Sequence, residues 1–190
     1  KLKNRPQWYT VTNRSRTYVK KILEKISGEV FKNYKINKIL RNDDNIRILI
    51  GNEYLDYDHV VLASHADQSL NMLDEATIQE KEILKKFTYV SNNAFLHIDE
   101  NLMPSKKKAW SSWNSISKDS STCVTYWLNK LQNLKSSKNY FLTLNPVQDI
   151  HKNKIIKKVN FTHPYFNNTN VKLQKELHLL QGKKRTWFCG

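Results

Sequence analysis

The sequence predicts a mixed α/β fold in which a sheet begins, is interrupted by an antiparallel block and resumes near the C-terminus. Apolar residues recur at helical spacing in three stretches, 15–28, 74–87 and 168–182. Short apolar runs bounded by turn residues fill 30–63, and strand-like segments dominate 89–166. This order is expected of a soluble domain whose sheet receives an inserted sheet.

The first helix is predicted by a one-sided apolar pattern in "SRTYVKKILEKISG". Its apolar side chains share one face: Tyr18, Val19, Ile22, Leu23 and Ile26. Asn13 or Ser15 is placed to cap its start, and Gly28 stands where a left-handed C-cap belongs. We therefore expect a helix over this stretch.

Four short strands are predicted next, at 30–31, 34–40, 46–50 and 59–63. The asparagine- and aspartate-rich segment 42–45 and the pair Gly51-Asn52 supply turns between them. The run from His59 to Ala63 is continuously apolar, which is typical of a strand buried on both faces of a parallel sheet.

A second helix is predicted over 74–87, where Thr77 and Glu80 have the spacing of a capping box. Strands are then expected at 89–99, 109–116, 122–131, 139–146 and 155–166, with a helix after Tyr126 as an equal alternative. A third helix carries Leu173, Leu177 and Leu180 and stops at Gly182. The closing "TWFCG" is predicted to return as a strand to the first sheet.

The net charge of +15 over 190 residues raises the question of an anionic partner. Of the 32 basic residues only six are arginine, and the lysines run along the whole chain. Nucleic-acid grooves favour arginine forks interleaved with aromatic side chains. We interpret the lysines as a solvated surface and expect no nucleic-acid partner, while a basic module for nucleic acid or an anionic surface stays open as an alternative.

The cysteines and the apolar runs limit the compartment. Cys123 and Cys189 form no CxxC motif, which excludes a zinc ribbon and a disulfide framework. No apolar run is long enough to cross a bilayer, so we expect no transmembrane segment. A reducing cytoplasm is the predicted location.

Two groups of side chains are candidates for chemistry on residue type alone. His97 and Asp99 share a strand face but lack an obvious third ligand, so we interpret them as a polar face near solvent and expect no metal site. Trp110, Trp113 and Tyr126 would form an aromatic wall around a ligand, although core packing is the favoured interpretation.

His163 precedes Pro164 at a strand end and is a further candidate for lining a pocket. No Ser-His-Asp, Walker or glycine-rich phosphate motif occurs in the sequence. The residues alone therefore define an α/β domain without a stated activity.

Seven sequence segments, which occur in the same order as in a known family, resemble segments of that family. They are "RPQWYTVTNRSRTYVKKI", "YDHVVLASHADQSLNML", "NNAFLHIDENLMPSKKKAWSSWN", "VTYWLNKLQNL", "YFLTLNP", "FTHPYF" and "LQGKKRTWFCG". Together they resemble the FAD-dependent amine oxidoreductase superfamily. The most similar branch comprises amine oxidase-like NAD/FAD-binding proteins related to the N-terminal flavin region of plant cyclopropane fatty acid synthases.

The resemblance implies part of a FAD/NAD(P)-binding Rossmann-like domain with an inserted, mostly antiparallel substrate domain. It places a partial FAD-binding domain at 1–73, the substrate domain at 74–166 and a return to the FAD-binding domain at 167–190. The family's GxGxxG turn, which holds the FAD diphosphate at a helix N-terminus, has no counterpart here. We therefore expect the chain to be an internal segment of a FAD-dependent oxidoreductase, inactive by itself.

The resemblance also implies which residues contact the flavin. By position in the matched phrases they are Arg14, Ser15, Arg16, Ile36, Ala63, Ser64, His65, Cys189 and Gly190. Asn13 and Arg14 replace a glycine pair of the family. The matched phrases imply no catalytic side chain, because the flavin carries the redox chemistry. The implied substrate is a small or lipid-like molecule, and a flavin-fold scaffold without catalysis stays open as an alternative.

Overall fold

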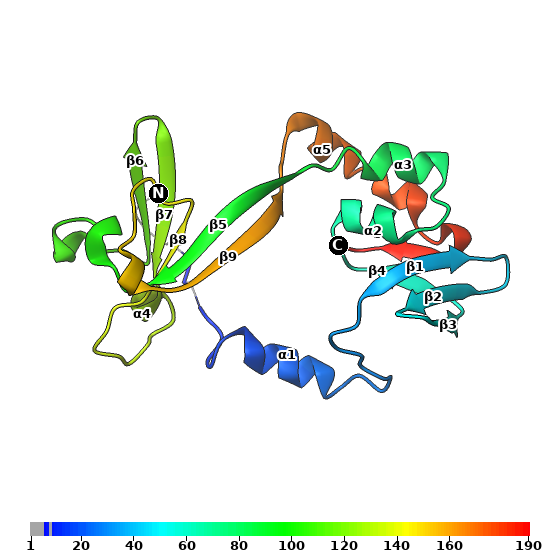
Figure 1. The fold of residues 1–190 in the computed structure, drawn as a ribbon, viewed down its shortest axis with the longest axis horizontal. Helices are drawn as coiled ribbons and strands as arrows, with labels where there is room; N and C mark the ends of the chain where they lie inside the picture. The colour runs from blue at the N-terminus through cyan, green and yellow to red at the C-terminus, as the bar shows by residue number, and fades with distance from the viewer. Residues whose placement is uncertain (1–5, 8) are drawn as a thin grey trace. The chain divides into compact units, whose positions relative to one another are not determined.

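The computed structural model describes residues 6–7 and 9–190, so Arg5 and Trp8 of the first family phrase lie outside the described residues. The chain forms two compact units (Figure 1). Unit 1 comprises the residues up to Val30 together with Ser91–Thr162, and unit 2 comprises Phe31–Val90 with His163–Gly190. These units are defined by the contacts within each of them. The predicted boundaries at 73 and 166 instead separate a FAD-binding part from a substrate domain, and they stay a prediction.

Unit 1 is built on a five-stranded sheet with the order β6-β7-β8-β5-β9. The strands are β5 (Tyr89–His97), β6 (Trp113–Lys118), β7 (Ser121–Trp127), β8 (Phe141–Leu144) and β9 (Ile155–Pro164). The pairs β6–β7, β7–β8 and β5–β8 are antiparallel. The antiparallel block predicted from the sequence is therefore confirmed.

Two small apolar clusters support this sheet. Leu102, Cys123 and Ile150 form one, and Met103, Trp110 and Phe141 form the other. Short helical turns connect the strands: 3-10 turns Glu100–Leu102, Lys107–Ala109 and Lys152–Lys154, and α4 (Leu128–Leu131) directly after β7. The helical alternative after Tyr126 thus holds for one turn.

Helix α1 (Ser15–Leu23) forms where the sequence predicts it, but its apolar face is not turned inward. No side chain of α1 is buried, and Tyr18, Val19 and Ile22 are 48%, 44% and 57% exposed. The helical period was sufficient to predict the helix. Among the described residues, this apolar face is therefore largely exposed, which the helical period alone does not reveal.

Unit 2 contains two small sheets. Strands β1 (Ile36–Arg41), β2 (Ile46–Ile50) and β3 (Glu53–Tyr57) pair antiparallel, and β4 (Val60–Leu62) pairs parallel with β10 (Thr186–Phe188). The return of the C-terminal strand to a sheet begun before the insertion is confirmed. The sequence missed β3, whose side chains are mostly exposed, and wrongly predicted a strand at 30–31.

Helices complete unit 2 around a continuous apolar core. They are α2 (Ala66–Met72), α3 (Ile78–Leu84), α5 (Asn168–Leu173) and the 3-10 turns Leu177–Leu180 and Lys183–Arg185. The Thr77–Glu80 capping box is present as predicted, whereas α2 was not foreseen. Phe188 of β10 packs against both apolar clusters of the unit, so the last strand joins them. One cluster comprises Ile39, Ile46, Val60, Leu62 and Leu73, and the other comprises Ile83, Leu84 and Leu180.

Candidate functional site

A cavity of about 190 Å³ lies in unit 2 where β4 and β10 end. Because the two strands are parallel, their carboxyl ends meet at the same edge. Ser64, His65 and Gly190 line the cavity, and the Cys189 N–H donates to the Leu62 carbonyl at 3.0 Å. The pairing therefore brings together two predicted flavin-contact segments that are more than 120 residues apart in the sequence.

The backbone approach at this edge is very close. A Cβ built on Gly190 would collide with the carbonyl oxygen of Ser64, so only glycine fits here. The Ser64 hydroxyl in turn lies 2.8 Å from that of Ser69, which is buried in α2. This edge is consequently formed by backbone and small polar groups.

An aromatic pair forms one wall of the cavity. The ring of His65 stacks on that of Tyr89, with centroids 4.3 Å apart and planes 12° apart. The Ala66 N–H donates to the Tyr89 hydroxyl oxygen at 2.7 Å, which anchors the start of α2 to β5. Phe166 and Phe188 also line the cavity. The wall is therefore largely apolar and contains planar rings.

The cavity is smaller than a site for a whole drug-sized ligand. Sites for drug-sized ligands usually enclose about 300–1,000 Å³, so 190 Å³ accommodates one portion of such a molecule. No Lys, Arg, Asp or Glu lines it. A planar or uncharged portion suits this lining better than a diphosphate. Ala63 and Cys189 lie at the same strand ends but are exposed, and neither lines the cavity.

The segment with Arg14, Ser15 and Arg16 lies in unit 1. It lines a second cavity of about 780 Å³ together with residues 132–135. Asn13 and Arg14 have φ angles of 60° and 70°, the positive values that a glycine pair would adopt. Arg14, with ψ −174°, occupies a region that is essentially restricted to glycine. The glycine-like backbone persists here although neither residue is glycine.

The remaining predicted residues are dispersed. Ile36 begins β1 and is 37% exposed. Trp110 is buried and packs edge-on against Trp127 and Phe141, as the core interpretation predicts. Trp113 is 58% exposed and contacts the Tyr126 ring at a centroid distance of 6.1 Å. His163 is exposed and belongs to unit 2, so Trp110, Trp113 and Tyr126 share a unit that does not contain it.

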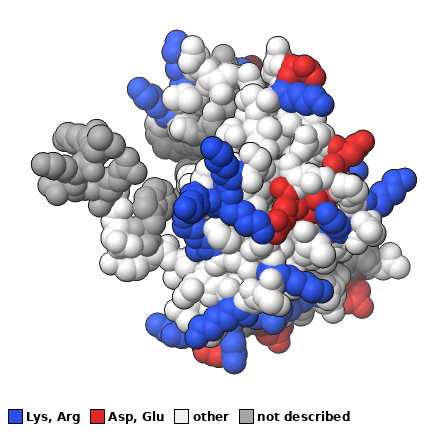
Figure 2. All heavy atoms as spheres, turned by 90° about the vertical axis from the view of Figure 1, so that its left-hand side faces the viewer, with Lys and Arg blue, Asp and Glu red and all other residues white. Residues whose placement is uncertain are grey.

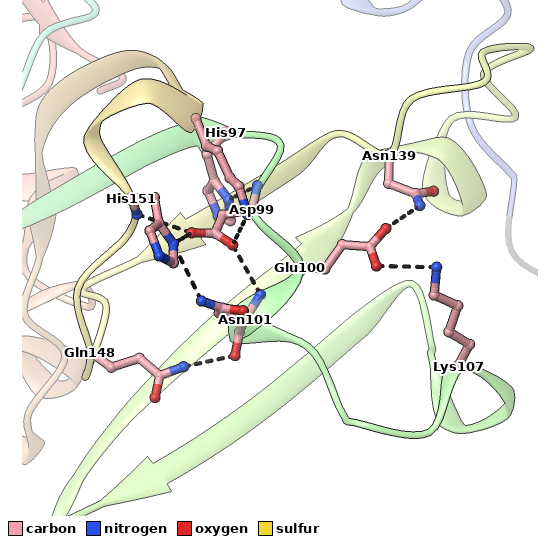
Figure 3. A network of polar contacts seen from close by, with 9 residues as sticks. His97, Asp99, Glu100, Asn101, Lys107, Asn139, Gln148 and His151 are labelled. Carbon is pink, nitrogen blue, oxygen red and sulfur yellow. Dashed lines mark hydrogen bonds and ion pairs between the residues drawn. The ribbon is translucent and has the colours of Figure 1, made fainter.

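A buried carboxylate in unit 1 is the feature that sequence reasoning missed (Figure 3). Asp99 is fully buried and accepts hydrogen bonds from the backbone and ring of His151, from the Lys154 ammonium and from the Asn101 N–H. The interpretation of His97 and Asp99 as a polar face near solvent is wrong, because both are 0% exposed. Their partners lie about 50 residues further along the chain, beyond the reach of local patterns.

The electrostatics of this cluster follow from burial and hydrogen bonding. Burial raises the pKa of Asp99, but the hydrogen bonds from His151, Lys154 and Asn101 outweigh it and hold that pKa well below its usual value. Burial lowers the pKa of His97 and outweighs the nearby charge of Asp99. The Asp99 N–H donates to His97 Nδ1, so neutral His97 donates from Nε2 to Thr143 Oγ1 at 2.8 Å.

The positive charge is unevenly divided between the units. Residues 91–162 contain eleven lysines and no arginine against four acidic residues, whereas residues 31–90 contain eight basic and ten acidic residues. Figure 2, seen from the side on which β6 lies in Figure 1, shows lysine and arginine side chains spread over that face. The net positive charge is therefore concentrated in unit 1, although lysines occur along the chain in both units.

Among the residues that the structure describes, no helix has the length and apolarity needed to cross a membrane. Within the same residues, no three His, Cys, Asp or Glu side chains gather where they could hold a metal ion.

Comparison with solved structures shows where this fold occurs. The chain is similar to a CLA-producing fatty acid isomerase from P. acnes (TM-score 0.60, 13% identity, 93% of this chain, 46% of that one). It is also similar to a putative protoporphyrinogen oxidase from Exiguobacterium sp. 255-15 (TM-score 0.62, 13% identity, 92% of this chain, 45% of that one). A redesigned putrescine oxidase matches less closely (TM-score 0.51, 10% identity, 70% of this chain, 29% of that one).

These similarities concern the fold. The chain spans less than half the length of each of these proteins. Neither a family model nor a curated protein matches the sequence. At 10–13% identity, the comparisons show that the fold of this chain also occurs in these proteins.

Proposed function

We propose that the chain is part of a FAD-dependent oxidoreductase of the amine oxidase-like kind. The observation that carries the proposal is the parallel pairing of β4 with β10. It gathers Ser64, His65 and Gly190 around one cavity, where a side chain at Gly190 has no room. Such close backbone approach is what the edge of a dinucleotide site requires.

The residues of this edge have separate roles in the proposal. The backbone at Ser64 and Gly190 approaches the cofactor, and the stacked His65–Tyr89 pair shields it from water. The family resemblance also assigns Arg14–Arg16 and Ile36 to the cofactor, and these contacts stay predictions. A bound flavin would provide the hydride or electron transfer, and the chain's own residues position it.

The substrate in this proposal is a small or lipid-like molecule that contacts the inserted sheet of residues 74–166. The proposed location of the protein is the cytoplasm. Fold similarity at 13% identity leaves the substrate to be measured.

The experiment is anaerobic reduction of the whole protein after loading with FAD. Bleaching of the flavin spectrum by a substrate, followed by recovery with an acceptor, is the expected result. A flavin that binds but is bleached by no candidate amine or lipid would instead support the scaffold alternative. The strained backbone at Arg14 keeps that alternative relevant, because it replaces a glycine position of the family.

A further inference from the structure

A further, polar cleft lies in unit 1, and none of the residues assigned to the flavin lines it. Its volume is about 690 Å³, within the range of small-molecule sites. Three parts of the sheet line it: Asn93 and Phe95 of β5, the hairpin between β6 and β7, and the segment 145–147 after β8. Lys158 of β9 completes the lining.

Two lysines supply the positive charge of this cleft. Lys118 ends β6, and Lys158 extends its ammonium over the ring of Phe95, 5.2 Å from the centroid. Neither lysine forms an ion pair among the described residues, although Asp119 also lines the cleft. The lining therefore carries a net charge of about +1, which a singly charged anion would neutralise.

The polar walls are held by hydrogen bonds of their own. The Asn93 N–H donates to the Asn145 side-chain oxygen at 2.9 Å, and the Asn145 N–H donates to the Asn93 carbonyl at 2.8 Å. Asp119 and Ser120 adopt φ angles of 47° and 64°, as in the tight turns that close hairpins. Both flanks of the cleft are thus fixed by the backbone.

The lining also contains an apolar strip formed by Phe95, Pro146 and Val147, which are partly buried. A ligand with only a charged group would leave this strip in contact with water. An exposed ion pair between an ammonium and a carboxylate contributes little binding free energy. An amphiphilic anion gains more here, because its charged end contacts the ammonium and its apolar end is buried against the strip.

We propose that this cleft binds a singly charged oxyanion, a carboxylate or phosphate group, carried on a molecule with an apolar portion. Lys118 and Lys158 contact the anionic group, and the strip formed by Phe95, Pro146 and Val147 contacts the apolar portion. Because arginine is absent from residues 91–162, recognition relies on point charges rather than on bidentate forks. The proposal does not depend on flavin binding.

Backbone amide NMR shifts of the full 190-residue chain test the proposal, with sodium hexanoate as the probe. Hexanoate is expected to shift the amides of residues 118–122 and of Asn145 and Val147 saturably, with a Kd of about 1–10 mM. Hexylammonium, which has the same chain length and the opposite charge, is expected to give no saturable shift. If hexanoate gives no saturable shift, or hexylammonium binds equally well, the proposal is overturned.

Variants separate the cleft from the general lysine surface. K118Q and K158Q are each expected to weaken hexanoate binding about three- to fivefold. K157Q removes the same charge from the opposite face of β9, which does not line the cleft, and should leave binding unchanged. Equal losses in K157Q and K158Q would assign binding to diffuse charge and overturn the proposal.

Inorganic phosphate at matched ionic strength distinguishes two sources of the anion. Tighter binding of hexanoate supports the amphiphile and a contribution from the apolar strip. Phosphate binding as tight as hexanoate at the same amides would overturn the assignment of the apolar portion.

Discussion

At the scale of single residues, Asp99 illustrates why a local pattern misjudged its environment. Alternation along the predicted strand 89–99 would place His97 and Asp99 on one face, and polar residues on a strand face are usually solvated. In the structure β5 ends at His97, and Asp99 instead caps the 3-10 turn Glu100–Leu102. Here the segment that carries His151 and Lys154 supplies hydrogen bonds to Asp99, while His97 is bonded to Thr143 of β8 and to the Asp99 N–H. The burial of such residues depends on contacts that only the tertiary structure defines.

Replacing Asp99 with Asn is expected to destabilise the protein by about 1–3 kcal/mol at pH 7, because buried donors lose a charged acceptor. The pKa of Asp99 is depressed in the folded state. Its contribution is therefore fully present above the unfolded carboxyl pKa of about 4 and is lost as the pH falls towards the folded value. Urea unfolding of D99N from pH 7 to pH 3 measures this. Exposed Asp149 provides the control, and D149N should behave as the parent.

The burial of His97 is expected to change the free energy of unfolding in a separate, higher pH range. Since burial lowers its pKa, the unfolded chain takes up a proton below about pH 6.5 while the folded chain does not. Stability should therefore fall as the pH drops below 6.5, by up to about 1.4 kcal/mol per pH unit. H97Q should reduce this slope between pH 6.5 and 5, and H178Q, at an exposed position, should retain it. An unchanged slope in H97Q would show that His97 is not the group responsible.

At the scale of elements, the most local signals were the most informative. The capping box at Thr77, the hairpin strand 46–50 and the Gly182 stop follow from residues within one or two turns. Strand β3 and helix α2 escaped because they are only five and seven residues long, so periodicity gave little signal. The edge of the candidate cavity became visible only through the pairing of β4 and β10.

Helix α3 is joined to β1 by a buried ion pair. The Arg41 and Glu80 side chains are 2% and 3% exposed, and Arg41 Nη2 donates to Glu80 Oε2 at 2.9 Å. Burial raises the pKa of Glu80, but Arg41 and Thr77 together lower it below its usual value. E80Q leaves the Arg41 charge buried and should cost about 3 kcal/mol or more. Chemical denaturation measures this, with E82Q at an exposed position as the control. If E80Q and the parent had equal free energies of unfolding, the predicted cost of burying an unpaired Arg41 charge would be wrong.

At the start of α1, in contrast, a substitution is expected to stabilise the protein. Arg14 has the backbone of a glycine, a conformation that costs about 1–3 kcal/mol for other residues. R14G should therefore raise the free energy of unfolding by about 1 kcal/mol, after the entropic cost of glycine in the unfolded chain. R16G, inside the helix, should lower it by up to about 1 kcal/mol. A loss of stability in R14G would show that Arg14 is not strained.

At the scale of the whole molecule, the family phrases and the similarity to solved structures are two separate observations, and the second concerns the fold alone. The phrases are read from side chains, whereas the comparisons rest on backbone geometry at 10–13% identity. The division of charge was not predicted, because a count along the sequence does not show which segments fold together. The lysine-rich unit and the nearly neutral unit therefore suggest different ligands.

The central claim, that the edge formed by β4 and β10 holds part of a flavin, is tested most directly by the visible absorption spectrum of the whole protein incubated with FAD. We predict flavin bands that remain after gel filtration. G190V should abolish them, because a side chain there collides with Ser64, whereas G28A, where a Cβ meets no neighbour, should retain them. An unmodified protein without flavin bands, or G190V with full FAD occupancy, would contradict the claim.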